Sequence, residues 1–241
     1  MKKPLILVAV VLCLVVIGLV VRPIITLEVA KIRAVHKFNA DSTAWLSHVP
    51  SAVTNIAAFK SSTPTAEVEL SGCMLALPTP EFRQDPGHKS VFTNDSLLVG
   101  FFGAIDPTNF ASLEQEVNCS NVFDLISRTY NANVGGIYSQ RSMAELHGYL
   151  GLIALKSTIG LGGLDHSFLR FNRGDFKGFV GGIFPADKIV TFEIYVKEKD
   201  EFLGGLVRAR NPGCNMNDVF HILSVLSVKI APPTNAASPA N

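Results

Sequence analysis

The strongest pattern along the chain is an uncharged apolar run near its N-terminus, Leu5–Val21. With Pro4 it gives 18 residues, which as a helix would rise about 27 Å, close to the roughly 30 Å hydrocarbon core of a bilayer. Its 14 Leu, Ile and Val residues favour insertion into lipid. The run therefore predicts a single N-terminal transmembrane helix over residues 1–22, with the lipid bilayer as its partner.

Two other interpretations of this run stay open. A cleaved signal peptide has an apolar region of about 7–15 residues and a small-x-small cleavage site. Here Glu28 stands at the −3 position before Ala30, Ile32 stands there before Ala34, and Cys13 lies too deep in the run for a lipoprotein signal. A buried core helix would need an equally apolar layer around it. We expect an uncleaved anchor.

The charges flanking the run do not settle its orientation, because more Lys and Arg residues follow it than precede it. They are Lys2 and Lys3 before the run, and Arg22, Lys31, Arg33 and Lys37 after it. A short basic tail ahead of a strong apolar segment is typical of a signal anchor. We therefore expect the large domain to be extracytoplasmic, either periplasmic or extracellular, with a cytoplasmic domain as the alternative.

Residues 23–65 are expected to connect the anchor to a folded domain. Pro23 should break or bend the first helix. Ile24–Phe38 has apolar residues near helical spacing and predicts a juxtamembrane helix, either a stalk or a dimerising or interfacial segment. Asn39–Thr65 is rich in Ser, Thr, Ala and Pro, which indicates a linker with one short helical piece around Ala52–Phe59.

The next part of the chain predicts two strands and then helices. Glu67–Leu77 alternates and stops at Pro78, and Ser96–Ile105 is an apolar strand. Asp106 followed by Pro107 predicts a helix start. Ser120 is the expected cap of a second helix, which ends at Gly135-Gly136 and has a buried face formed by Val122, Phe123, Leu125 and Ile126.

Ser142–Glu145 fits a capping box, which predicts a helix over Leu146–Ile159. Gly148 and Gly151 weaken this prediction because glycine disfavours helix interiors. The helix also contains His147 and Lys156, so we do not interpret it as a second membrane span.

The C-terminal third is dominated by strands, and it sets the predicted fold class. Val190, Phe192, Ile194 and Val196 alternate with polar residues, as expected for a half-exposed strand. The expected elements are strands Phe168–Asn172, Phe176–Ile183, Lys188–Lys197 and Phe202–Arg208, and a final helix Asp218–Val228. The sum is an α+β domain over residues 66–230, with helices packed on an antiparallel sheet, and a disordered tail over 231–241.

Composition narrows the classes of function. Hydrophobic residues make up 48% of the chain and charged residues 17%, which excludes a disordered or coiled-coil protein. Lys plus Arg total 21 against 20 Asp plus Glu, so no basic excess indicates nucleic-acid binding.

Three cysteines lie outside the anchor: Cys73, Cys119 and Cys214. The last two each stand in a polar segment just before a predicted helix. In an extracytoplasmic domain a Cys119–Cys214 disulfide is plausible and would contribute about 4 kcal/mol. The sequence has no CxxC or zinc-type Cys/His spacing, so we expect no metal site and no cofactor.

Candidate catalytic residues are few. Asp165, His166 and Asp175 could supply a base and an orienting carboxylate to a membrane-tethered hydrolase, although no G-x-S-x-G elbow provides a nucleophile. A solvated hairpin end explains the same residues. We therefore expect a membrane-anchored protein with an extracytoplasmic binding or envelope-interaction domain, whose protein or small-molecule partner the sequence does not identify, and we keep the hydrolase as the alternative.

Overall fold

The computed structural model describes residues 2–38, 46–59, 65–79, 81–105, 110–159 and 168–232. The chain divides into two compact units, each built from two segments. The helical unit comprises Met1–Val49 and Phe110–Gly160, and the sheet unit comprises Pro50–Asn109 and Leu161–Asn241. This division cuts through the span 66–230 that the sequence pattern suggests as one domain.

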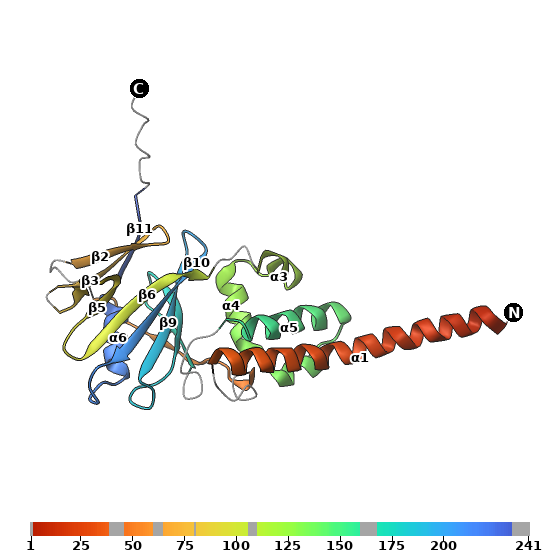
Figure 1. Ribbon diagram of the computed structural model, residues 1–241. Helices are drawn as coiled ribbons and strands as arrows, with labels where there is room; N and C mark the ends of the chain where they lie inside the picture. The colour runs from red at the N-terminus through yellow and green to blue at the C-terminus, as the bar shows by residue number, and fades with distance from the viewer. Residues whose placement is uncertain are drawn as a thin grey trace, which may run out of the picture. The chain divides into compact units, whose positions relative to one another are not determined.

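The helical unit consists of helices that gather on α5. Its elements are α1 (Lys2–Phe38), α3 (Ala111–Glu116), α4 (Val122–Asn131), the short 3-10 helix η2 (Val134–Ser139) and α5 (Met143–Lys156). Helix α1 runs beside α5, and α3, α4 and η2 also contact α5 (Figure 1). The helix expected over Leu146–Ile159 is therefore present as α5, although it begins at Met143 and ends at Lys156, and it lies at the centre of this unit.

Helix α1 continues through Pro23, so of the expected break or bend at this residue the break is wrong. Proline removes one backbone donor, and here the helix continues past that gap for a further 15 residues, to Phe38. Within the part of the chain that the structure describes, no helix combines the length and the apolar character needed to cross a membrane.

The helix caps agree with the predictions in part. Ser142 accepts the backbone N–H of Glu145 as expected, but the Glu145 carboxylate takes the N–H of Arg141 rather than that of Ser142. The cap of α4 is Asn121, not Ser120, because the Asn121 side chain accepts the N–H of Asp124.

Two other expected helix ends are also displaced. Helix α4 ends at Asn131, and Gly135-Gly136 lie in η2. Helix α3 begins only at Ala111, after Phe110, while the expected start at Asp106-Pro107 lies outside the described residues. The predicted buried face of α4 is confirmed in full.

The sheet unit is built on an eight-stranded sheet in the order β1-β7-β8-β9-β10-β6-β5-β4. Its strands are β1 (Ser51–Asn55), β4 (Arg83–Asp85), β5 (His88–Thr93), β6 (Leu97–Ile105), β7 (Phe168–Asn172), β8 (Lys177–Gly181), β9 (Ile189–Val196) and β10 (Glu201–Ala209). The pair β1–β7 is parallel and the other pairs are antiparallel. The α+β class is confirmed, but the sheet is mixed rather than wholly antiparallel.

Strand β1 replaces the helical piece expected around Ala52–Phe59. Val53 and Thr54 are β-branched and suit an extended backbone. They pair with Arg170 and Phe171 of β7, far along the chain. Pairing with a strand that is distant in the sequence therefore determines the conformation of this segment, whose own residues favour neither helix nor strand strongly.

A second, three-stranded sheet has the order β11-β3-β2, with β2 (Thr65–Leu70), β3 (Cys73–Pro78) and β11 (Ser227–Ile230). The single strand expected over Glu67–Leu77 is therefore a hairpin. Its two-residue turn, Ser71-Gly72, has positive φ at both positions, 50° and 66°, as a type I′ turn requires.

The final helix, α6 (Met216–Val225), is shorter than the expected Asp218–Val228 at its C-terminal end. Leu226 leaves the helical conformation, and Ser227 opens β11, which pairs with β3. The sequence pattern did not separate this strand from the helix because Leu226 and Val228 continue the apolar positions of the helix. Of the tail, residues 233–241 lie outside the described part of the chain.

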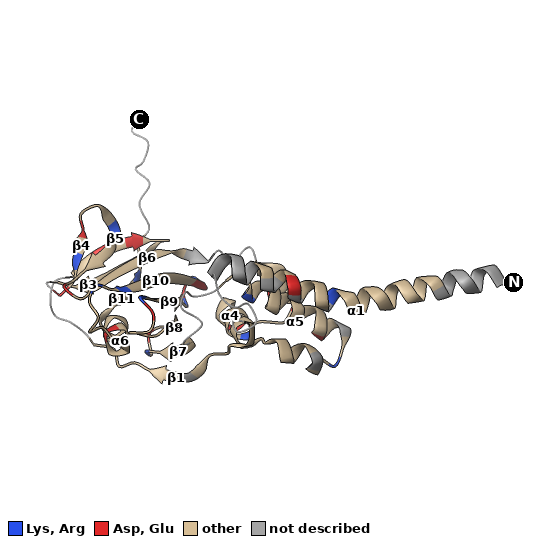
Figure 2. Ribbon diagram, turned by 60° about the horizontal axis from the view of Figure 1, so that its bottom comes forward, with Lys and Arg blue, Asp and Glu red and all other residues tan. Residues whose placement is uncertain are grey.

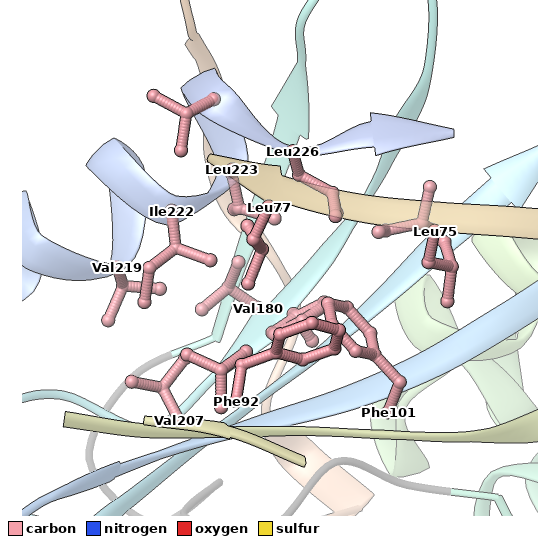
Figure 3. Packing of buried hydrophobic residues seen from close by; sticks show 14 of the residues in the cluster. Leu75, Leu77, Phe92, Phe101, Val180, Val207, Val219, Ile222, Leu223 and Leu226 are labelled. Carbon is pink, nitrogen blue, oxygen red and sulfur yellow. The ribbon is translucent and has the colours of Figure 1, made fainter. Parts of the chain in front are cut away.

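The core of the sheet unit lies between one face of the eight-stranded sheet and a layer formed by α6 and β3. Figure 3 shows Val219, Ile222 and Leu223 of α6 together with Leu75 and Leu77 of β3, facing apolar side chains of the large sheet. The prediction of a helix packed on a sheet is confirmed here.

Strand β9 is not half exposed, contrary to its alternating pattern. Phe192 and Ile194 are fully buried in the core, but Glu193 and Tyr195 on the other face are also only 5% exposed. Tyr195 packs against Phe202 of the neighbouring strand, with ring centroids 5.4 Å apart. Both faces of this strand are therefore covered.

Candidate binding pocket

Of the predicted catalytic residues, only Asp175 lies within the described part of the chain; Asp165 and His166 lie outside it. Asp175 accepts hydrogen bonds from the Nε of Arg173, at 2.6 Å, and from its Nη2. Desolvation alone would raise the pKa of Asp175, but the hydrogen bonds and the charge of Arg173 outweigh it and hold that pKa below its usual value. This carboxylate is engaged in an ion pair, and the hydrolase hypothesis stays untested.

Arg173 is buried, and its side chain bonds to the backbone of α6. Its side chain is 5% exposed, and its guanidinium carbon lies 3.7 Å from the centre of the Phe176 ring. Its Nη1 donates to the backbone carbonyls of Leu223 (2.9 Å), Ser224 (3.2 Å) and Leu226. Arg173 therefore holds the C-terminal end of α6, where helix carbonyls lack internal partners.

Cys119 and Cys214 are both free thiols, so the disulfide between them stays a prediction. Cys119 belongs to the helical unit and Cys214 to the sheet unit. Burial raises the pKa of the Cys119 thiol to about 11, so this group is protonated at neutral pH and is a poor nucleophile. The Sγ of Cys214 lies 3.3 Å from the carbonyl oxygen of Ser96, which fits a buried thiol.

A cavity of about 510 Å³ opens in the helical unit. Residues of α3, α4 and α5 and of the turns that follow α3, α4 and η2 line it. Its apolar wall is made by Val117, Ala132, Ala144, Gly148 and Leu152. We call this cavity the helical pocket.

The glycines of α5 explain how the helical pocket forms. A Cβ on Gly148 would lie 2.9 Å from Val117 Cγ1, and one on Gly151 would lie 2.5 Å from Leu113 Cδ1. These two positions, three apart on the helix, therefore let α3 and the turn after it approach α5 closely. The glycines that weakened the helix prediction are the sites of this close packing.

The polar groups of the helical pocket are bonded to the protein. Arg128 donates through Nε (3.1 Å) and Nη2 (3.0 Å) to the carboxylate of Asp124, and through Nη1 (2.9 Å) to the carbonyl of Val117. Glu116 forms an ion pair with His147 of α5. The Tyr149 hydroxyl bonds both the N–H and the carbonyl of Asn133. These contacts fix the rim of the pocket.

Lys156, at the end of α5, supports the same region from inside. Its side chain is fully buried, and Nζ donates to the carbonyls of Ala132 (2.6 Å), Tyr130 (3.0 Å) and His48 (2.5 Å). Burial lowers the pKa of this amine to about 7. Since Ala132 lines the helical pocket, Lys156 positions part of its wall.

Sequence reasoning missed the role of Lys156. It used this residue only as an argument against a second membrane span. The available signal was one lysine in an otherwise apolar helical run, which demands a buried partner. Its partners are backbone carbonyls, whose positions no sequence pattern reveals.

Among the residues that the structure describes, no group of three or more His, Cys, Asp or Glu side chains could hold a metal ion. Comparison with protein-family models, with curated proteins and with solved structures finds no match for this chain.

Proposed function

We propose that this chain is a single-pass membrane-anchored binding protein. Leu5–Val21 is the anchor, the residues after it face water on the extracytoplasmic side, and the helical pocket binds a ligand. One observation carries the proposal: within the continuous apolar run, the large side chains that the structure describes are exposed rather than packed against other residues.

That observation concerns the first half of α1. The ten large hydrophobic side chains from Val10 to Val21 are 40–65% exposed. In Figure 2 a long stretch of α1 is uniformly tan, without the colours of either charge. A helix that is apolar on every side is unsuited to water, and lipid is its natural surrounding. In the sequence the run continues to Leu5, through residues whose side chains are not described.

The binding role rests on the helical pocket. Its volume of about 510 Å³ falls within the range of small-molecule sites, and it combines an apolar wall with a few fixed polar groups. Orientation rests on the short tail with Lys2 and Lys3 ahead of the run, as in a signal anchor. The helical pocket would then take its ligand from the extracytoplasmic space.

Membrane fractionation of the full chain tests the anchor. We expect the chain to stay in the membrane pellet after an alkaline carbonate wash. The double variant Leu12→Arg/Val16→Arg should move to the supernatant, because each arginine disfavours insertion by about 3 kcal/mol. The matched control is Ile25→Arg/Val29→Arg on the same helix beyond the run, which should stay in the pellet.

A pair of reporters fused after Asn241, each active on one side of the membrane only, tests the orientation. We expect activity only from the extracytoplasmic reporter. A wild-type chain in the supernatant, or a mature protein that begins well beyond Val21, would contradict the anchor. Activity of the cytoplasmic reporter would contradict the orientation.

A further inference from the structure

The helical pocket has more negative than positive charge. Glu116 of α3 and Glu145 of α5 line it, and Arg128 is its cationic lining residue. The Arg128 guanidinium is already neutralised by two hydrogen bonds to the Asp124 carboxylate. Glu116 is paired with His147, whereas Glu145 has no basic side-chain partner among the residues that the structure describes. A cationic ligand suits this balance better than an anionic one.

The hydrogen-bonding groups of the pocket point to the same class of ligand. Several donor groups of its lining side chains already serve protein oxygens: Asn131 Nδ2 donates to Ser127 O, Gln140 Nε2 to Gly136 O, and the Tyr149 hydroxyl to Asn133 O. Arg128 donates from all three of its nitrogens. A carboxylate accepts about four hydrogen bonds, and Glu145 uses one oxygen for the Arg141 N–H. The carboxylate oxygens of the lining therefore remain available as acceptors, which favours a ligand that brings donors.

The remaining wall of the pocket is apolar, so it suits a ligand with an apolar part. Val117, Ala144 and Leu152 form an uncharged wall, and the close approach of α3 to α5 at Gly148 keeps that wall continuous. Apolar contact supplies affinity in such a site, while the few polar groups fix the orientation of the ligand.

We propose that the helical pocket binds a small organic ammonium ion with an apolar, ring-sized body. The ammonium group donates to Glu145 and Glu116, and the body packs against Val117 and Leu152. This inference rests on the binding part of the proposed function and is independent of the anchor.

The test uses the full chain in lipid nanodiscs and two probes of similar size, 2-phenylethylammonium and 3-phenylpropionate. Both carry a phenyl ring on a short chain, and they differ in the sign of their charge. Saturation-transfer NMR and calorimetric titration measure their binding. We expect the ammonium probe to bind at least about tenfold more tightly, a difference of about 1.4 kcal/mol.

Two variants assign the binding to this pocket. Ala144→Phe places a ring in the pocket from an exposed helix position and should abolish binding of the ammonium probe. Its matched control is Ala111→Phe, an exposed alanine on α3 that does not line the pocket. Glu145→Gln keeps an oxygen for the Arg141 N–H but removes the charge. It should weaken the ammonium probe about fivefold and leave the fold intact by circular dichroism.

The proposal is overturned if 3-phenylpropionate binds as well as the ammonium probe, if the ammonium probe fails to bind, or if Ala144→Phe and Glu145→Gln bind it like the wild type. Membrane fractionation tests the anchor, and the titrations test ligand binding. A chain that is not anchored but binds the ammonium probe refutes the anchor alone, and an anchored chain that does not bind it refutes this inference alone.

Discussion

The two units of this protein each bury a basic side chain at the C-terminal end of a helix, but the two side chains have different partners. In the helical unit, Lys156 donates to carbonyls at the end of α4. In the sheet unit, Arg173 donates to carbonyls at the end of α6 and also pairs with the carboxylate of Asp175, which is 57% exposed. Lys156 therefore bonds helix-end carbonyls without a charged partner, whereas Arg173 bonds them together with the carboxylate of Asp175.

Both arrangements answer the same physical problem. The last four carbonyls of a helix lack intrahelical donors, and they form the negative end of the helix dipole. A buried cation satisfies them and complements the dipole. The cost differs, because a guanidinium keeps its charge and spreads it over a planar group, whereas a buried amine loses its proton readily. The stability of the helical unit should therefore depend on pH through Lys156, while the Arg173 contacts should not.

The largest effect is expected for Lys156→Met. Methionine keeps the apolar stem but removes the donor to three carbonyls, at about 1 kcal/mol or more each, so the free energy of unfolding should fall by about 3 kcal/mol. Urea unfolding of the full chain in micelles, followed by circular dichroism, measures the change. The control is Lys89→Met at an exposed position of β5, for which we expect a change within about 0.5 kcal/mol. Equal losses in the two variants would show that the carbonyl contacts of Lys156 contribute nothing.

A smaller loss, about 2 kcal/mol, is expected for Arg173→Met in the same unfolding experiment, because the buried carbonyls at the end of α6 lose their donor. Asp175→Asn isolates the ion pair. Since Asp175 is exposed, this variant should lose less than about 1 kcal/mol. If Asp175→Asn costs as much as Arg173→Met, then the ion pair rather than the carbonyl contacts makes Arg173 important, and the comparison with Lys156 fails.

Local pattern was sufficient for elements whose signals are short-range. Strands β9 and β10 were predicted from the local sequence pattern, and the buried face of α4 from helical spacing. Segments that depend on distant partners were not predicted. Strand β1 is fixed by its parallel pairing with β7, and β11 by its pairing with β3. The Ser71-Gly72 turn was a local signal, but the pattern of apolar positions does not show it.

The candidate site was less predictable than the fold. Its shape depends on Gly148 and Gly151, which the sequence presents only as poor helix formers. Its support depends on Lys156, whose acceptors lie 24, 26 and 108 positions away along the chain. Asp175 was a candidate from the sequence, but only the structure shows that it pairs with Arg173 at the end of a helix.

The effect most specific to the comparison is the pH dependence of stability. Burial lowers the pKa of Lys156 from its ordinary 10.5 to about 7 in the folded chain. Between these values the unfolded chain binds more protons than the folded one, so stability should rise with pH, by at most about 1.4 kcal/mol per pH unit. Below about pH 7 both states hold the proton, and this contribution is flat. Unfolding measured from pH 7 to 10 should show the slope in the wild type and in Arg173→Met, but not in Lys156→Met. Parallel curves for all three would mean that Lys156 stays charged in the folded chain, and that the two buried cations are equivalent after all.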